Sequence, residues 1–440
     1  MTNWKEYKLG ELCTITSSKR IFYKEYVSEG VPFFRSKEII EKANGNDIST
    51  ELFITKDKFQ EIKDKFGVPL AGDILLTSVG TLGVSYQVQE SDYFYFKDGN
   101  LTWFKDFSDE INTKFLLYWL RSPLGKEGFN SITIGSTQAA LTIAGLKGIK
   151  LSIPDLPTQT AIAEILSSLD DKIELNNKIN QELENLAQTL FKQWFIDFEF
   201  PNEKGEPYKS SGGALVDSEL GEIPKGWEVG VLEDLIDFSN GNAFKSKELL
   251  KEDIGDCYHV FKMGHIKKGG GLNADGTKSY YEKSKAKKLN KYVLRVGDLL
   301  MCMTDMKGNV ALLGHTALMN ENDKYIVNQR VGLLRPNNAL GIDFPYLYIL
   351  TNSNDFIEDL RSRANSGVQV NLSTSEIKVS KVLLPPKAIN VAFDNCVKAF
   401  FESIFNNTKE NQELTNLRDT LLPKLISGEL EVAEVMAEKA

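Results

Sequence analysis

The sequence contains few of the residues that build disulfide frameworks and metal sites. It has 4 cysteines and 3 histidines in 440 residues. The cysteines, Cys13, Cys257, Cys302 and Cys396, form no Cys-x-x-Cys pair, and so few histidines cannot provide a recurring set of metal ligands. We therefore expect buried thiols, with neither a disulfide-stapled fold nor a metal site.

Long apolar runs are absent as well. No segment approaches the ~18 consecutive apolar residues of a membrane-spanning helix, and the charged start MTNWKEYKLGELC lacks the apolar run of a signal peptide. These absences argue against export and membrane insertion. The sequence predicts a cytoplasmic protein.

Positive charge is not in excess, because the formal net charge is -9 at pH 7. A free-standing nucleic-acid binder usually relies on clustered Lys and Arg, whose contacts with phosphates release counterions. The net charge argues weakly against such a binder, although a total does not exclude local basic clusters. With 42% hydrophobic residues, the chain has enough apolar side chains for two or three domains.

Motifs of catalysis and cofactor binding are missing too. The sequence has no Asn-Pro-Pro-Tyr or Asp-Pro-Pro-Tyr base-methylation loop and no Gly-x-x-x-x-Gly-Lys-Ser/Thr phosphate loop. His259, His265 and His315 belong to no recognisable nucleophile motif, so structural histidines are favoured at all three positions. We expect no catalytic residue in this chain.

The most informative feature present is an internal repeat. INQELENLAQTL at 179–190 returns as ENQELTNLRDTL at 410–421, and further matching pairs precede it in the same order. These pairs are GDILL at 72 with GDLLM at 297, NLTW at 100 with NQRV at 328, and WKEYKLGEL at 4 with WEVGVLEDL at 227. The chain is therefore predicted to be a tandem duplication.

Each half is predicted to be a mixed domain followed by one long helix, because short apolar runs bounded by Gly, Asn and Asp precede a long helical pattern. A segment rich in Gly, Pro and Ser joins the halves and is expected to be an exposed connector. The predicted boundaries are 1–157 and 224–387 for the mixed domains, 158–200 and 388–428 for the helices, 201–223 for the linker and 429–440 for a C-terminal tail. The fold class is thus α+β.

The two helical patterns predict a heptad seam with polar residues at its centre. Apolar residues alternate four and three residues apart, and Asn176 and Asn180 in the first helix match Asn407 and Asn411 in the second. Such asparagines fix the register, because a shifted pairing leaves each amide without a hydrogen-bond partner. The residues expected to pair the helices are Asn176, Asn180, Leu183, Leu190, Asn407, Asn411, Leu414 and Leu421.

Antiparallel pairing would bring the asparagines together and make a pseudo-two-fold molecule with a mixed domain at each end of a rigid spacer. From Ile162 to Trp194 the first helix would be about 48 Å long at about 1.5 Å per residue, or roughly 14 base pairs of B-DNA. The alternative is two amphipathic helices that each pack on their own domain. The matched asparagines favour pairing.

The order of these motifs resembles a known family. GSTQAALTIAGLKGIKLSIPDLPTQTAIAEILSSLDDKIELNN and then LGEIPKGWEVGVLEDL are similar to the end of a first target-recognition domain, the first shared helix and the start of a second domain in specificity subunits of type I restriction-modification systems. The resemblance covers essentially the whole chain. One departure is Asn390, which stands in the second copy where the first has Gln159.

The resemblance implies a function and a set of partners. Two target-recognition domains would each read one block of a split, asymmetric DNA target, while the two antiparallel coiled-coil helices hold the blocks apart and dock two methyltransferase (M) subunits. The chain itself would be non-catalytic and hold no cofactor. The M subunits would methylate adenine with S-adenosylmethionine, and restriction (R) subunits would use ATP and Mg to translocate and cut double-stranded DNA.

DNA-contacting residues are expected in polar, Gly-bounded loops, because Arg, Lys, Asn, Gln and Ser read base edges or contact phosphates. In the first domain the candidates are Lys19, Arg20, Arg35, Ser36, Lys37, Asn100, Ser136 and Gln138. In the second domain they are Lys262, His265, Lys267, Lys268, Asn328, Gln329, Arg330 and Gln369. Several of these lie in a lysine-rich segment from Lys262 to Arg295, for which phosphate contact is favoured over a merely solvated surface.

Candidates that differ between the halves are the better base readers. Gln138 and Gln369 occupy matching positions, so a shared structural turn is at least as good an interpretation for them. The residues ranked above them are Arg20, Arg35, Lys37, Lys262, His265, Lys267 and Arg330.

Two other functions compete with a DNA-reading subunit. One is a helical adaptor that assembles partner proteins without reading DNA sequence, and the other is an enzyme whose motif is not recognisable. The lysine-rich segment argues against the adaptor, since protein docking alone does not require it. The missing motifs argue against the enzyme.

Overall fold

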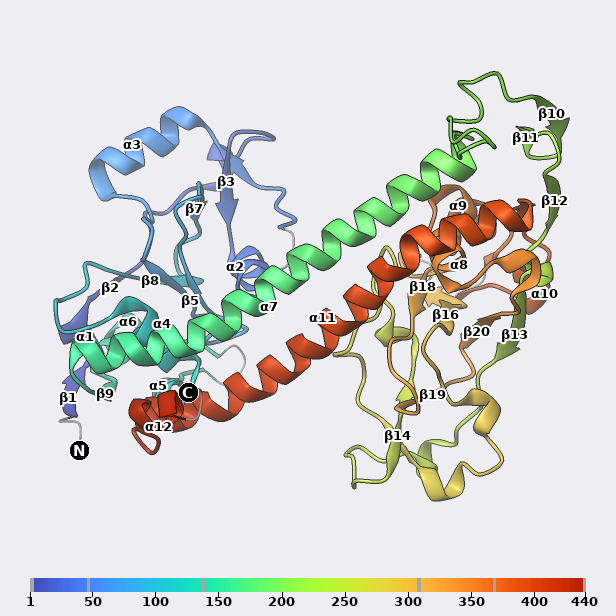
Figure 1. The fold of residues 1–440 in the computed structure, drawn as a ribbon. Helices are drawn as coiled ribbons and strands as arrows, with labels where there is room; N and C mark the ends of the chain where they lie inside the picture. Colours follow the sequence, from blue (N-terminus) through green and yellow to red (C-terminus); the bar gives the residue numbers. More distant parts are fainter. Residues whose placement is uncertain (1–3, 46–47, 136–138, 307–309, 367–368, 438–440) are drawn as a thin grey trace. The chain divides into compact units, whose positions relative to one another are not determined.

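The computed structural model describes residues 4–45, 48–135, 139–306, 310–366 and 369–437. The chain divides into two compact units (Figure 1). Unit 1 comprises Met1–Asn177 and Thr408–Ala440, and unit 2 comprises Lys178–Asn407. Each unit therefore contains a mixed domain together with one part of each long helix.

Unit 1 begins with the first mixed domain. Its elements are β1 (Lys5–Lys8), α1 (Leu9–Leu12), β2 (Thr14–Thr16), η1 (Tyr23–Glu25), β3 (Val31–Phe34), α2 (Ser36–Ala43), β4 (Phe53–Ile54), α3 (Lys56–Phe66), β5 (Ile74–Thr77), β6 (Ser85–Gln87), β7 (Tyr95–Phe96), β8 (Leu101–Lys105), α4 (Thr113–Arg121), α5 (Pro123–Ile132), α6 (Ile143–Gly148) and β9 (Lys150–Ile153). Helix α7 (Leu156–Phe191) follows and continues into unit 2.

Unit 2 holds the second mixed domain. Its elements are η2 (Lys192–Ile196), β10 (Leu215–Ser218), β11 (Gly221–Pro224), β12 (Glu228–Val231), η3 (Leu232–Asp234), β13 (Ile236–Asn240), η4 (Ser246–Glu248), β14 (Cys257–Phe261), η5 (Met263–His265), β15 (Tyr280–Glu282), η6 (Lys283–Lys285), η7 (Asn290–Tyr292), β16 (Leu299–Cys302), β17 (Thr304–Met306), β18 (Thr316–Leu318), β19 (Tyr325–Val327), β20 (Val331–Pro336), η8 (Ala339–Gly341), α8 (Phe344–Thr351), α9 (Asn354–Ser362), β21 (Asn365–Ser366), β22 (Gln369–Asn371), α10 (Thr374–Lys378) and β23 (Lys381–Leu384). Helix α11 (Lys387–Ser427) leads back into unit 1, where α12 (Val432–Ala437) follows.

The two mixed domains share one strand topology. The main sheet has the order β2-β8-β5-β6 in unit 1 and β13-β20-β16-β18 in unit 2. A second sheet has the order β4-β3-β7 in one and β15-β14-β19 in the other, and each contains one parallel pair, β3 with β7 or β14 with β19. The predicted duplication is therefore confirmed at the level of strand order.

The repeated Gly-Asp turn shows how similar sequences give similar structure. Gly72 and Gly297 both have positive φ, +92° and +91°, which an L side chain rarely adopts. The following Asp73 accepts hydrogen bonds from the Leu70 amide at 2.9 Å and the Trp103 indole at 2.8 Å, and burial raises its pKa. The turn leads directly into a fully buried strand, β5 or β16, at the centre of each domain.

Each mixed domain packs against parts of both long helices. In unit 1, Ile162 and Leu166 of α7 share a core with Leu425 and Ile426 of α11. In unit 2, the Phe191 ring of α7 lies 5.2 Å from Tyr346 and 6.1 Å from Phe393 of α11. The predicted antiparallel helix pair is confirmed, and the alternative in which each helix packs only on its own domain is wrong.

The predicted asparagines meet across the helix pair. In unit 1 the Asn176 amide donates to Asn411 Oδ1 at 2.9 Å, and the Asn411 amide donates to Asn177 Oδ1 at 2.9 Å. In unit 2 the Asn407 amide donates to Asn180 Oδ1 at 2.8 Å. Asparagine side chains thus form hydrogen bonds across the centre of the seam, which favours this register over shifted ones. The buried Oδ1 of Asn176 has no donor within the described residues.

The predicted seam leucines lie at the edges of the two cores. Leu183 and Leu190 pack against the core of unit 2, and Leu421 packs against the core of unit 1. Leu414 is half-buried. These contacts extend the apolar part of the helix pair on either side of the asparagines.

The segments predicted as a linker and a tail contain more structure than the sequence indicated. Within 201–223 the chain forms the β10–β11 hairpin, and Ile223 joins the core of unit 2. After residue 428, Leu430 and Val432 pack against the core of unit 1. In both places a few apolar residues anchor segments whose composition is mainly polar.

None of the helices within the described ranges combines the length and apolar character needed to cross a membrane.

Candidate nucleic-acid interface

In each unit, two parallel strands end side by side and present polar residues at their carboxyl ends. In unit 1, β3 and β7 end at Phe34 and Phe96, and the Lys97 amide donates to the Phe34 carbonyl at 2.8 Å. The residues at this point are Arg35 and Lys97. We call the carboxyl ends of these strands, with the loops attached to them, the reading edge of each unit.

The reading edge of unit 1 gathers several residues predicted from the sequence. The Ser36 hydroxyl donates to the Asn100 carbonyl at 3.4 Å, and the same carbonyl accepts from the Ser78 amide at 2.8 Å. The Leu141 amide in turn donates to the Ser78 carbonyl at 2.9 Å. Residues Ser136 and Gln138 lie outside the described residues.

Lys19 and Arg20 lie on an exposed segment that is attached to this edge. Arg20 pairs with Asp98 through Nε and Oδ2 at 2.7 Å, although its side chain is 67% exposed. The Lys19 amide donates to the Tyr95 hydroxyl at 2.7 Å. The side-chain ammonium group of Lys19 lies 5.0 Å from the centre of the Phe66 ring. Both cations therefore have solvent-facing charge beside the loop that precedes Asn100.

Arg35 has a structural partner that the sequence did not reveal. Its Nη2 donates to Oε1 of the fully buried Glu38 at 2.7 Å, and this hydrogen bond raises the pKa of Arg35. A buried carboxylate needs a charged partner, so the guanidinium group is committed to Glu38. Arg35 therefore has a structural role, and base reading by this residue stays a prediction. Lys37 remains exposed and lies 3.7 Å from Glu41.

The reading edge of unit 2 has the same construction and different residues. The Asn328 amide, after β19, donates to the carbonyl of Phe261 at the end of β14, so Asn328 lies beside Lys262. The Gln329 amide donates to the carbonyl of Asn242 at 2.9 Å. Asn242 and, in unit 1, Lys97 were not predicted from the sequence. Lys97 directly follows the apolar run at the end of β7, whereas Asn242 follows a polar segment after β13 and carries no such signal.

Arg330 and Gln369 belong to the same edge of unit 2. The Met303 amide donates to the Arg330 carbonyl, and the Met303 carbonyl accepts from Leu372, next to β22. Gln369 pairs with Met306 across β17 and β22. Gln329 and Arg330 are exposed, and within the part of the chain that the structure describes their side chains have no ion pair or hydrogen bond. These side chains are available for a ligand.

The prediction that His265 contacts DNA is wrong, because its side chain is fully buried. Its Nδ1 accepts from the Lys262 amide at 3.0 Å, and its Nε2 lies 3.2 Å from Nε2 of His259. Burial, and then the neighbouring His259, lower the pKa of His265 to about 4. The neutral ring closes the turn after β14 and cannot reach a base edge.

The lysines of the lysine-rich segment differ in their surroundings. Lys267 and Lys268 are exposed in a glycine turn, where the Lys267 amide donates to the Gly271 carbonyl at 2.9 Å. Burial raises the pKa of Glu184 of α7, and the positive charge of Lys267 partly opposes this effect. Further along, Lys285 pairs with Glu282. The phosphate-facing role of the segment stays a prediction, and Lys267 and Lys268 are exposed as that role requires.

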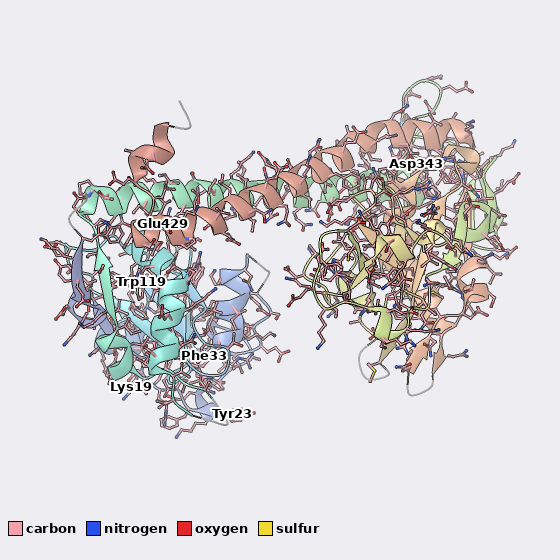
Figure 2. All side chains as sticks on the ribbon, turned by 90° about the horizontal axis from the view of Figure 1, so that it is seen from below. Lys19, Tyr23, Phe33, Trp119, Asp343 and Glu429 are labelled. Atoms are coloured by element: carbon pink, nitrogen blue, oxygen red, sulfur yellow. The ribbon has the colours of Figure 1, made fainter. Side chains whose placement is uncertain are left out.

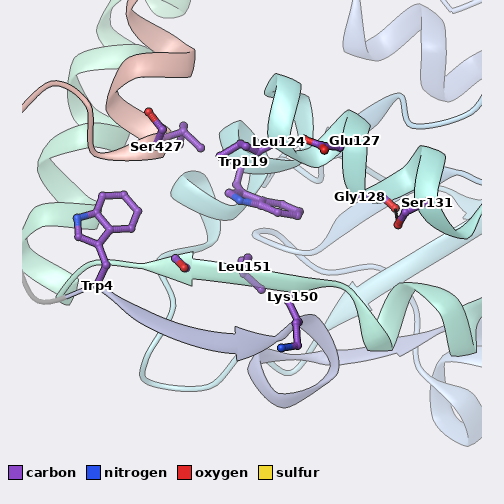
Figure 3. Close-up of a pocket in the computed structure, with 11 residues that line it drawn as sticks. Trp4, Trp119, Leu124, Glu127, Gly128, Ser131, Lys150, Leu151 and Ser427 are labelled. Atoms are coloured by element: carbon purple, nitrogen blue, oxygen red, sulfur yellow. Dashed lines mark hydrogen bonds between the residues drawn. The ribbon is translucent and has the colours of Figure 1, made fainter.

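A pocket elsewhere in unit 1 is lined by none of the residues predicted to contact DNA (Figure 3). It lies between strand β9 and helices α4 and α5, and Trp4, Trp119 and Leu124 supply its apolar surface. Its lysine, Lys150, is paired with Glu6 at 2.7 Å. Across the described ranges, no three His, Cys, Asp or Glu side chains are grouped so that they could hold a metal ion.

Comparison with known proteins assigns the duplicated fold to a family. A family model described as "Type I restriction modification DNA specificity domain" matches residues 1–185 and 224–416. The chain belongs to this family. The two matched segments correspond to the two mixed domains and the helices that follow them, and the chain is thus a specificity subunit of the type I restriction-modification class.

Individual relatives agree with this assignment. The type I restriction enzyme HindI specificity subunit of Haemophilus influenzae is 26% identical over 490 aligned positions, which cover 98% of this chain and 100% of the relative. The MjaIX specificity subunit of Methanocaldococcus jannaschii is 28% identical over 74% of this chain and 71% of its own length. The crystal structure of a type I S subunit from M. genitalium shares the fold, with a TM-score of 0.57, 18% identity and coverage of 96% of both chains.

Proposed function

We propose that this chain reads a bipartite, asymmetric DNA target and catalyses no reaction itself. The observation that carries the proposal is the pair of reading edges, which occupy equivalent places on a duplicated framework but present different side chains. By strand register, unit 1 has Lys97 and Asn100 where unit 2 has Asn328 and Arg330. The pairing of Asn100 with Asn328 predicted from the sequence is therefore wrong by two residues. Equivalent placement supports one mode of binding, and different side chains support two different base sequences.

The same proposal includes the partners. Two M subunits would dock on the helix pair and supply adenine methylation with S-adenosylmethionine, and R subunits would supply ATP- and Mg-dependent cleavage. Helices α7 and α11 expose apolar side chains beside polar ones, namely Leu175, Leu186 and Leu417. Such a surface is compatible with docking of partner helices. The net charge of -9 is consistent with a subunit that contacts DNA together with other proteins.

The experiment begins with the target, which methylation sequencing of the host genome identifies. The complex with M subunits is then titrated with the target duplex and with duplexes changed in one block or the other, at fixed salt. The double variant Gln329→Ala/Arg330→Ala should lose discrimination at one block only, by about 10- to 100-fold, because each bidentate base contact contributes about 1–3 kcal/mol.

Lys324→Ala is a suitable control, because this exposed lysine pairs with Glu321 on the same domain and is not on the reading edge. It should leave both blocks unchanged. If the wild-type complex bound all duplexes equally, the helical adaptor would be the better function. If the double variant affected both blocks equally, the division of reading between the units would be rejected.

A further inference from the structure

Unit 1 carries an exposed pair of aromatic residues at the tip of the segment between β2 and β3. The side chain of Phe22 is 57% exposed and that of Tyr23 is 88% exposed. Figure 2 shows Tyr23 at the periphery of unit 1, with Lys19 in the same region and Phe33 further inside. Two adjacent, solvent-exposed rings are an unfavourable arrangement for a protein surface unless they bind a partner.

The tip is held in a fixed conformation. The Phe22 amide donates to Glu25 Oε2 at 2.8 Å, and Glu25 pairs with Lys58 of α3 at 3.0 Å. The Tyr23 ring contacts Tyr26 edge to face at 5.9 Å between centroids, and Tyr26 packs on the buried Phe33 at 5.1 Å. The rings are therefore positioned by the fold before any ligand arrives, which lowers the entropic cost of binding.

The equivalent turn of unit 2 shows that the fold itself does not require these rings. Both η1 and η4 are single 3-10 turns that lie between equivalent strands and end in Lys-Glu, Lys24-Glu25 in one and Lys247-Glu248 in the other. Where unit 1 has Phe22 and Tyr23, however, unit 2 has Lys245 and Ser246. The aromatic pair is thus a property of unit 1 and needs a reason other than folding.

The surroundings of the tip favour a polyanionic partner. Lys19, Arg20 and Lys24 are all exposed and lie within four residues of the rings in sequence. Arg20 is bound to Asp98, which immediately precedes the Gly99-Asn100 part of the reading edge. Aromatic rings beside cations suit a nucleic acid, because the rings can stack on bases while the cations contact phosphates.

We propose that Phe22 and Tyr23 form an aromatic wedge that enters the DNA duplex beside the block read by unit 1 and unstacks one base step there. Lys19, Arg20 and Lys24 contact the phosphates on either side. Unit 2, which has Lys245 and Ser246, makes only phosphate and polar contacts at the equivalent place. The inference rests on the proposed DNA-reading function and adds an asymmetric deformation of the target to it.

The test uses the full-length chain in its complex with M subunits and the target duplex, with 2-aminopurine placed in turn at each position beside each block. This base fluoresces strongly when it is unstacked. The adenines that the M subunits methylate are left unlabelled, because a methyltransferase extrudes its target base from the stack. Wild type should give a severalfold rise at one step next to the unit 1 block and none at the other block. The variant Phe22→Lys/Tyr23→Ser, which copies the turn of unit 2, should abolish the rise and weaken binding roughly 5- to 100-fold, as loss of base–aromatic stacking does.

The reciprocal variant Lys245→Phe/Ser246→Tyr is the matched control, and a new signal beside the second block would support the proposal. Unchanged fluorescence in a wild-type complex that still discriminates its target would overturn the wedge. The wedge would also be overturned if Phe22→Lys/Tyr23→Ser weakened binding but the wild-type complex gave no rise in fluorescence. The rings would then contact only the outside of the duplex. If wild type did not discriminate any target, the proposed function itself would fail.

Discussion

At the start of α11, Asn390 and Asp394 each have one buried side-chain oxygen without a hydrogen-bond donor in the described structure. The Asn390 amide donates to the carbonyls of Leu340 and Pro385, which fixes its orientation. Asp394 accepts from the Asp343 amide at 3.1 Å. Burial, and then the charge of Asp343, raise the pKa of Asp394 to about 7, while Lys398 opposes this effect.

We predict that Asp394→Asn stabilises the protein at pH 8. The pKa of an unfolded Asp is near 4, below the value of about 7 in the folded protein. The folded state therefore binds the proton more tightly, and stability falls as pH rises from about 4 to about 7 and stays reduced above that. Removing the charge should recover about 1–2 kcal/mol at pH 8, after allowance for solvent screening.

Urea denaturation of wild type and Asp394→Asn between pH 5 and pH 8 checks this prediction. The variant should show a smaller pH dependence, while Glu402→Gln on the exposed face of the same helix should behave as wild type. Asn390→Gln is an informative companion, since Gln159 at the equivalent place of unit 1 accepts from the Asn112 amide at 2.9 Å. A loss of stability in Asp394→Asn at pH 8 would contradict the argument.

The Arg35–Glu38 pair leads to a second prediction at the residue scale. Arg35→Ala should destabilise unit 1 by about 3 kcal/mol or more, because it leaves the fully buried Glu38 carboxylate without its cation. Lys37→Ala, which removes a neighbouring exposed pair, should cost less than about 1 kcal/mol. Chemical denaturation measures both. An Arg35→Ala variant of normal stability that had lost DNA discrimination would contradict the structural role and support Arg35 as a base reader.

Residue type alone could not separate these roles. Arg35, Asn100 and Lys262 were predictable as members of polar loops, because each follows or precedes an apolar run in the sequence. Their partners were not predictable, because the burial of Glu38 and of His265 depends on packing between segments distant in sequence. An apolar run followed by an arginine looks the same whether the guanidinium group faces solvent or a buried carboxylate.

At the scale of single elements, the two ends of the helix pair differ in polarity. In unit 1, Asp170 of α7 accepts from Arg418 of α11 at 2.8 Å and from the Tyr118 hydroxyl at 2.7 Å. The matching repeat positions in unit 2 are Phe401 and Ala187, and both are buried in its core. The pairing of α7 with α11 thus uses a charged network in one unit and apolar packing in the other.

Arg418→Met should weaken the helix pair in unit 1 by about 1–2 kcal/mol, since it removes a charged hydrogen bond from Asp170 while Tyr118 remains. Urea denaturation followed by helical circular dichroism measures the change. Lys409→Met, which removes an exposed pair with Glu413 on the same helix, is the control and should be neutral. An equal effect of the two substitutions would show that the network adds nothing beyond surface charge.

The long helices were the most predictable elements, because the heptad pattern extends over several turns and ends near the observed bounds of α7 and α11. The pairing of strands was not predictable. Strands of two to six residues, such as β7 and β20, are too short to show a clear alternation of apolar and polar residues. The sequence therefore does not reveal that β3 and β7 are parallel, or that β8 lies between β2 and β5. The β10–β11 hairpin was missed for a related reason, since its composition resembles that of an exposed loop.

For the molecule as a whole, the predicted spacer function of the helices stays a prediction from the sequence. Deleting four residues within Leu183–Leu190, with a matched deletion in α11 that preserves the asparagine contacts, removes about 6 Å of helix, or roughly two base pairs. The two blocks of the methylated target should then keep their sequences and change their separation. Methylation sequencing of cells that carry the variant provides the measurement.

Deleting Lys209–Gly212, an exposed part of the segment between the two repeats, is the control for this experiment. It removes the same number of residues without shortening either helix, so the separation of the blocks should not change. An unaltered separation after the helix deletion would show that the helices do not determine it.

The packing of Leu425 and Ile426 into the core of unit 1 affects how the protein is made. The first mixed domain leaves the ribosome early, yet part of its hydrophobic core is encoded after the whole of the second domain. Its folding can be completed only after synthesis of the second domain, when the last turns of α11 have emerged. A premature stop codon shortly before Leu421 would therefore damage the domain that was translated first, and quality-control proteases would encounter it as an incomplete N-terminal fold.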